Sequence, residues 1–187
     1  IPLYLAGHSA GGGLILNYAA DKSHSTDVEG LILLAPYLGP LSGAIRERGA
    51  REGFVKKVRT WLYIINSIVH IEYFRHIPAV YFNYSEREIK SSQLLVSTYS
   101  YVMSSATTPY QVKDVFAALD VPFDIYIGDQ DEQFIPEKVI AYKECAPHVS
   151  EASHAQVVPG LKHISILVDA AQLIAKTVWK LGSFKHI

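Results

Sequence analysis

Four short apolar segments along the chain have the length and composition of buried β-strands. They span residues 3–6, 30–35, 122–127 and 155–158. Stretches in which apolar residues recur at helical spacing follow the first, third and fourth of them. Strands that alternate with helices in this way are typical of an α/β fold with a mostly parallel sheet flanked by helices.

Three helices can be placed from the pattern. Leu14, Ile15, Tyr18 and Ala19 recur at helical spacing directly after the first strand, and Pro136 predicts the first turn of another helix. The last helix presents one apolar face, and Gly182 is predicted to end it. The residues of that face are Ile166, Ala170, Leu173, Ile174, Thr177, Val178 and Leu181.

The turn between the first strand and the first helix reads Gly7-His8-Ser9-Ala10-Gly11, which is a G-x-S-x-G pentapeptide. A serine at such a turn is held in a strained backbone conformation with its hydroxyl exposed near the first amides of the helix. We expect Gly7 and Gly11 to leave room that a Cβ atom would fill. We interpret His8 as a residue that fills the turn and points away from the pocket.

A nucleophilic serine needs a base, and the base needs an acid to orient it. The loop after the third strand contains Asp129, Asp131 and Glu132, and the loop after the fourth strand ends in His163. Both loops follow strands and so lie at the sheet edge where parallel sheets build their sites. The spacing after Gly128 favours Asp131 as the acid, with Asp129 and Glu132 as alternatives. His148 and His154 lie in a polar loop before the last strand, where we expect them to be solvated. The remaining histidines, which have no matching context, are His24, His70, His76 and His186.

The segments GHSAGG, GDQDEQF and PGLKHISIL resemble the nucleophile, acid and histidine segments of the α/β-hydrolase superfamily. Within it they are most similar to monoacylglycerol lipases, lysophospholipases and S33-type serine hydrolases. The resemblance implies that Ser9 is the nucleophile, Asp131 the acid and His163 the general base, with the backbone N–H of Ala10 in the oxyanion hole. It also implies a small-molecule ester substrate, an acyl-enzyme intermediate and no cofactor.

By the same resemblance, the four strands correspond to strands 5 to 8 of the α/β-hydrolase sheet. We therefore expect a carboxyl-terminal portion of that fold, without the amino-terminal half of the core and its second oxyanion donor. The predicted organisation is core over residues 1–36, a mainly helical cap over 37–116, and core again over 117–187. The long middle segment exceeds what a simple crossover between strands needs.

The predicted cap contains two further stretches of helical spacing and many aromatic residues. The first comprises Trp61, Ile64, Ile65, Ile68, Val69 and Ile71, and the second Leu94, Leu95, Thr98, Tyr99, Val102 and Met103. The uncharged run around the first is shorter than the roughly 20 residues of a membrane span, so a cap helix is favoured over a helix on a membrane surface. An apolar cap favours a hydrophobic acyl substrate, and ordinary packing is the alternative interpretation.

Composition narrows the classes of partner and cofactor that the protein is expected to bind. With 17 basic and 18 acidic residues the net charge is -1, which gives no reason to expect a nucleic-acid partner. The histidines show no metal-ligand spacing, so we expect no metal site. The single Cys145 excludes an internal disulfide and is compatible with a reducing compartment such as the cytoplasm. The sequence assigns no oligomeric state.

Two alternatives to an esterase stay open. An S33-like aminopeptidase would need an acidic pocket for the substrate's amino group, and the candidate residues Glu47, Glu72 and Glu86 are scattered. A non-catalytic binding protein on the same fold is the other alternative.

Overall fold

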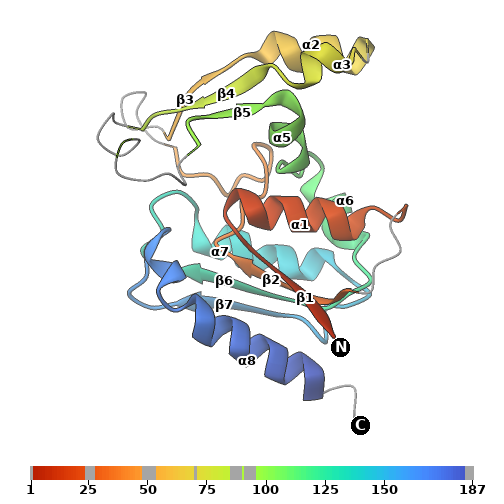
Figure 1. Cartoon of the computed structure of the whole chain (residues 1–187). Coiled ribbons are helices and arrows are strands. Elements are labelled where there is room, and N and C mark those ends of the chain that lie inside the picture. Colours follow the sequence, from red (N-terminus) through yellow and green to blue (C-terminus); the bar gives the residue numbers. More distant parts are fainter. Residues whose placement is uncertain are drawn as a thin grey trace. The chain divides into compact units, whose positions relative to one another are not determined.

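A computed structural model describes residues 2–23, 28–47, 54–69, 71–84, 90 and 96–183. The chain divides by its internal contacts into two compact units. The first unit comprises Ile1–Arg46 and Thr107–Ile187, and the second comprises Glu47–Ala106. Figure 1 shows the elements of both units, and all three predicted site residues belong to the first.

The first unit is built on a parallel sheet of four strands. These are β1 (Leu3–His8), β2 (Val28–Leu34), β6 (Phe123–Gly128) and β7 (His154–Val158), which pair in the order β1-β2-β6-β7. The four predicted strands and their parallel arrangement are confirmed. Because all four run in the same direction, the loops that follow β1, β6 and β7 lie at one edge of the sheet.

Helices cover both faces of this sheet. Figure 1 shows α1 (Ala10–Ala20), α6 (Val112–Ala117) and α7 (Pro136–Ile140) on one face and α8 (Ala170–Ser183) on the other. Two short 3-10 helices, η1 (Ala141–Cys145) and η2 (Ser165–Leu167), follow α7 and precede α8. The predicted helix start at Pro136 is confirmed. The predicted stop at Gly182 is wrong, because α8 continues to Ser183.

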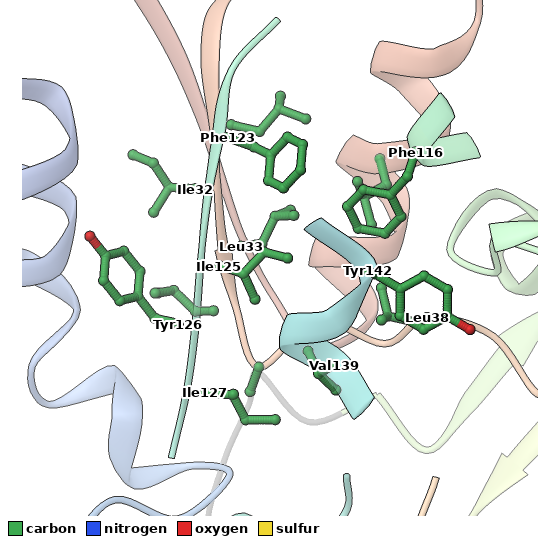
Figure 2. Packing of buried hydrophobic residues seen from close by; sticks show 14 of the residues in the cluster. Ile32, Leu33, Leu38, Phe116, Phe123, Ile125, Tyr126, Ile127, Val139 and Tyr142 are labelled. Carbon is green, nitrogen blue, oxygen red and sulfur yellow. The ribbon is translucent and has the colours of Figure 1, made fainter. Parts of the chain in front are cut away.

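The core lies on both sides of β6, and every residue of that strand is buried. Figure 2 shows Phe123, Ile125 and Ile127 directed toward the side of α7, while Tyr126 points toward α8. Each fully buried large apolar side chain contributes about 1.5–3 kcal/mol relative to its exposed state. The strand that carries the acid loop is therefore anchored from both faces.

Helix α1 contacts its surroundings through glycines. A Cβ atom on Gly12 would lie 2.7 Å from Cβ of Pro36, and one on Gly13 would lie 2.2 Å from the carbonyl oxygen of Thr107. Leu14 and Tyr18, by contrast, are each 39% exposed. The helix was predicted from Leu14, Ile15, Tyr18 and Ala19, but its buried residues are Gly12, Gly13 and Leu16.

The second unit combines helices with an antiparallel sheet. Its strands are β3 (Val55–Val58), β4 (Pro78–Phe82) and β5 (Thr98–Ser100), paired in the order β3-β4-β5. Its helices are α2 (Thr60–Ile68), α3 (Glu72–Arg75) and α5 (Tyr101–Ala106). The sequence analysis expected a mainly helical segment here and did not predict the sheet.

One detail of the predicted cap helices is wrong. Thr98 and Tyr99 lie in a strand, because a short apolar run fits either period; Leu94 and Leu95 are outside the described residues. In α2 the buried residues are Leu62 and Asn66. The helix itself is present, and much of its predicted apolar face is exposed, as shown by Trp61 at 44%, Ile64 at 61% and Ile68 at 75%. Within the described ranges, no helix combines the length and apolar character needed to cross a membrane.

Candidate active site

Ser9 occupies a strained turn between β1 and α1. Its backbone angles are φ 51° and ψ −118°, a region that residues with a Cβ atom rarely adopt. Four backbone hydrogen bonds hold this turn. Ser9 N–H donates to the Leu34 carbonyl at 3.0 Å, and the Ser9 carbonyl accepts from the N–H groups of Tyr37 at 2.8 Å, Gly12 at 2.9 Å and Gly13 at 3.3 Å. The neighbouring strand therefore imposes the conformation of the serine.

The two glycines of the pentapeptide have different surroundings. A Cβ atom on Gly7 would lie 2.4 Å from the carbonyl oxygen of Gly11, so the expected close approach is confirmed at this position. A Cβ atom on Gly11 would meet nothing within 4 Å. The expectation of a collision at Gly11 is wrong, because that Cβ would point into open space.

Asp131 lies in the loop after β6 and is only 1% exposed. Its Oδ1 accepts hydrogen bonds from the backbone N–H groups of Gln133 and Phe134, both at 2.8 Å. Burial alone would raise the pKa of Asp131, but the hydrogen bond and charge of His163 and these two amides together lower the pKa below its ordinary value. The carboxylate is thus held in its ionised form.

Arg46 supports this loop from a segment distant in sequence. Its Nε donates to the carbonyl oxygens of Asp131 at 2.8 Å and of Phe134 at 2.9 Å. One arginine side chain therefore binds two carbonyl oxygens of the loop that carries the carboxylate.

His163 follows β7 and is 6% exposed. With its proton on Nδ1, the ring donates to Oδ2 of Asp131 at 2.9 Å, and its Nε2 accepts from the hydroxyl of Ser9 at 3.0 Å. The Phe134 ring and the imidazole pack nearly perpendicular to each other, with ring centroids 5.0 Å apart. The structure therefore brings together the three residues predicted to form the site, which come from three different loops of one sheet edge.

The N–H of Ala10 is the first amide of helix α1. The first amides of a helix have no carbonyl partner within the helix, and the helix dipole places partial positive charge there. This end of α1 can stabilise negative charge beside the Ser9 hydroxyl.

A model of the family described as serine aminopeptidase, S33, matches residues 1–169. The chain belongs to this family. Among curated proteins, none matches the chain significantly. Comparison with solved structures therefore identifies the fold of the S33-family chain.

Three solved structures illustrate the likeness. The monoacylglycerol lipase of Paleococcus ferrophilus has a TM-score of 0.59 and 13% identity, over 97% of this chain and 68% of that one. A soluble variant of the monoglyceride lipase of Saccharomyces cerevisiae has a TM-score of 0.59 and 16% identity, over 96% and 62%. The α/β hydrolase GrgF of a Penicillium species has a TM-score of 0.54 and 16% identity, over 95% and 62%.

These similarities show that the S33-family chain has the α/β-hydrolase fold. The chain spans between 62% and 68% of the length of the three structures. At identities this low, the likeness concerns the fold alone, and the chemistry is argued from the site.

The alternative acids of the S33-family chain have other contacts. Asp129 Oδ1 accepts a hydrogen bond from the backbone N–H of Gly160 at 2.7 Å. Glu132 Oε2 accepts one from the backbone N–H of His163 at 3.0 Å. Neither of these two hydrogen bonds involves the imidazole ring, which contacts Asp131.

His8 does more than fill the turn. Its Nε2 donates to the carbonyl oxygen of His163 at 2.8 Å, and the two rings lie 4.9 Å apart. Burial lowers the pKa of His8, and the neighbouring His163 lowers it further, whereas the hydrogen bond to the carbonyl and the charge of Asp131 oppose this. Sequence reasoning missed this contact, since adjacency to Ser9 was the only signal for it.

The other histidines lie away from this contact network or outside the described residues. His76 is exposed and contacts Glu72 at 3.1 Å, and His148 and His154 are also exposed. His24, His70 and His186 are outside the described residues. In the part of the chain that the structure describes, no group of three or more His, Cys, Asp or Glu side chains could hold a metal ion.

Proposed function

We propose that this chain carries the reaction centre of a serine hydrolase that cleaves carboxylic esters. The hydrogen-bonded series from the Ser9 hydroxyl through the imidazole to a buried carboxylate is the observation that supports this most directly. In that series a weak nucleophile faces a base, and the base is oriented by an anion. The strained turn at Ser9 adds support, because strain of this kind is concentrated at functional sites.

The proposed reaction begins with attack of Ser9 Oγ on the carbonyl carbon of the ester. His163 Nε2 takes the hydroxyl proton, and Asp131 stabilises the imidazolium without itself becoming protonated. The tetrahedral oxyanion would accept a hydrogen bond from the N–H of Ala10. His163 then returns the proton to the leaving alcohol, and the acyl group remains on Ser9.

Water completes the cycle by the same route. His163 removes a proton from the water as it attacks the acyl carbon, and a second tetrahedral oxyanion forms beside Ala10. Collapse of that species releases the carboxylic acid and returns the proton to Ser9 Oγ. The cycle needs no cofactor, since every proton moves between Nε2 and an oxygen.

A hydrophobic acyl substrate is the proposed class. Two of the similar structures are a monoacylglycerol lipase and a monoglyceride lipase. Exposed apolar side chains of α2, among them Trp61, Ile64 and Ile68, support the view that the second unit is a cap that offers apolar surface to an acyl chain. That assignment of the inserted segment, over 37–116, stays a prediction.

Peptide-bond cleavage is the second candidate, favoured by the description of the matching family. It would require a free acidic group for the substrate's amino terminus. Glu72 contacts both Arg75 at 2.8 Å and His76 at 3.1 Å, and Glu86 is outside the described residues. The engagement of Glu72 favours the ester over the aminoacyl amide.

The test is labelling of the full-length protein with a fluorophosphonate, with Ser9→Ala as the control, followed by turnover of a nitrophenyl ester and an aminoacyl nitroanilide. We expect labelling that Ser9→Ala abolishes, and faster turnover of the ester. Turnover of the anilide alone would replace the esterase proposal with the aminopeptidase. A folded protein that neither labels nor turns over would indicate a binding protein.

A further inference from the structure

The main chain of His163 is held from both sides by side chains that take no part in the proposed proton transfers. Glu132 accepts a hydrogen bond from its N–H at 3.0 Å, and His8 donates one to its carbonyl oxygen at 2.8 Å. His163 lies in a turn between β7 and η2, so neither group belongs to a strand ladder or helix. The N–H and the carbonyl oxygen of His163 each have a side-chain partner instead.

These two side chains are sequence neighbours of the two residues that the ring contacts. His8 precedes Ser9, and Glu132 follows Asp131. The turn at Ser9 thus reaches His163 twice, at ring Nε2 and at the carbonyl oxygen. The acid loop also reaches it twice, at ring Nδ1 and at the N–H. The same two loops therefore hold both the His163 ring and the His163 main chain by hydrogen bonds.

The electrostatics of His8 suit this place. A half-buried neutral imidazole with its proton on Nε2 donates to the carbonyl without adding a second positive charge beside His163. The lowered pKa of His8 keeps the ring neutral near neutral pH. A neutral neighbour does not oppose the imidazolium that forms on His163 during the proposed reaction.

We propose that His8 and Glu132 are positioning residues that hold the His163 peptide, so that both ring nitrogens stay within hydrogen-bond reach of Ser9 and Asp131 at once. The inference rests on the proposed hydrolase function. Its consequence is kinetic, because a misplacement of about 1 Å at a reacting group can lower turnover on the order of a hundredfold.

The variants remove or keep one hydrogen bond at a time in the full-length protein. His8→Leu and Glu132→Leu remove the donor and the acceptor. His8→Gln keeps an N–H as many bonds from Cβ as Nε2, and Glu132→Gln keeps an oxygen acceptor. Asp129→Leu is the matched control, because Asp129 lies in the same loop as Glu132 and accepts a hydrogen bond from Gly160 rather than from His163.

With a nitrophenyl ester, we expect kcat to fall at least about tenfold in each leucine variant while KM stays within about twofold. The glutamine variants should recover kcat to within about threefold of the parent, and Asp129→Leu should retain it similarly. The double leucine variant should lose less than the product of the single losses, because both bonds restrain one peptide.

A structural readout accompanies the kinetics. The resonance of the His163 Nδ1 proton should shift in the leucine variants and return in the glutamine variants. If the leucine variants do not fold, His8→Asn and Glu132→Asp, which are too short to reach, are expected to show the same loss.

Parent-like kcat in folded leucine variants, with Ser9→Ala inactive, would refute the positioning role and leave the hydrolase intact. An equal loss in Asp129→Leu would also refute it, because general loop order would then be responsible. Full activity in Ser9→Ala would refute the proposed function instead, and the proton resonance would then decide the positioning role alone.

Discussion

Replacement of Lys180 by methionine tests whether a buried ion pair fastens helix α8 to the sheet. Asp124 on β6 is fully buried, and its Oδ1 accepts from Lys180 Nζ at 2.9 Å. Its Oδ2 accepts from the hydroxyls of Thr177 at 2.9 Å and Tyr126 at 3.1 Å. Burial raises the pKa of Tyr126 to about 12, with a further contribution from Asp124, so this phenol keeps its proton and remains a donor.

The expected loss of stability depends on which of the two charged side chains is exposed to water. The Lys180 side chain is 31% exposed, whereas Asp124 has no exposure. Removing Lys180 leaves a carboxylate with two neutral donors and no cation, for which we expect a loss of about 3 kcal/mol in the free energy of unfolding. Asp124→Asn together with Lys180→Met should cost less than Lys180→Met alone, because no buried charge is left.

Urea unfolding of the full-length protein at neutral pH, followed by circular dichroism, measures these differences. Lys176→Met is the matched control, because Lys176 lies on the same helix and bonds to the neutral side chain of Gln156. We expect that control to change the free energy of unfolding by less than about 1 kcal/mol. A Lys180→Met loss as small as that of the control, or a double variant less stable than Lys180→Met, would refute the reasoning.

Three further outcomes are expected. Ser9→Ala and His163→Ala should abolish ester turnover, and Asp131→Asn should lower kcat by about 10⁴-fold; near-normal kcat in any of them would remove that residue's assignment. Because the folded pKa of Asp131 is lowered, its stabilisation is present above the unfolded value of about 3.9 and is lost as pH falls through the folded pKa, so Asp131→Asn should show a shallower acid loss in urea titrations. Gly7→Ala should destabilise the protein strongly, whereas Gly11→Ala should stabilise it by about 0.5–1 kcal/mol in thermal melts, and equal effects would contradict the difference in Cβ space.

The strands and the three site residues could be predicted from the sequence, because local patterns of apolar residues determine them. The strands before Ser9, Asp131 and His163 are short apolar runs, and their order places the serine, acid and histidine at one sheet edge. The contacts of His8 and Glu132 could not be predicted, because they join side chains to the backbone of a residue that is distant in sequence.

The spacing of apolar residues did not predict the secondary structure where a short run fits a helix and a strand equally well. Tyr99 lies in a strand although its neighbours recur at helical spacing. The apolar stripe that includes Ile64 is exposed while Leu62 is buried, because a stripe indicates a helix without indicating which neighbours the helix meets.

The backbone of Ser9 also bears on how this chain can change over time. At φ 51° and ψ −118° the position suits glycine, which adopts such angles without the clash that a Cβ atom creates. A Ser9→Gly chain would therefore be easier to fold than its parent while lacking the hydroxyl. If selection acted only on the amount of folded protein, glycine would be favoured at this position. Serine would be kept there only if selection also acted on the reaction of its hydroxyl.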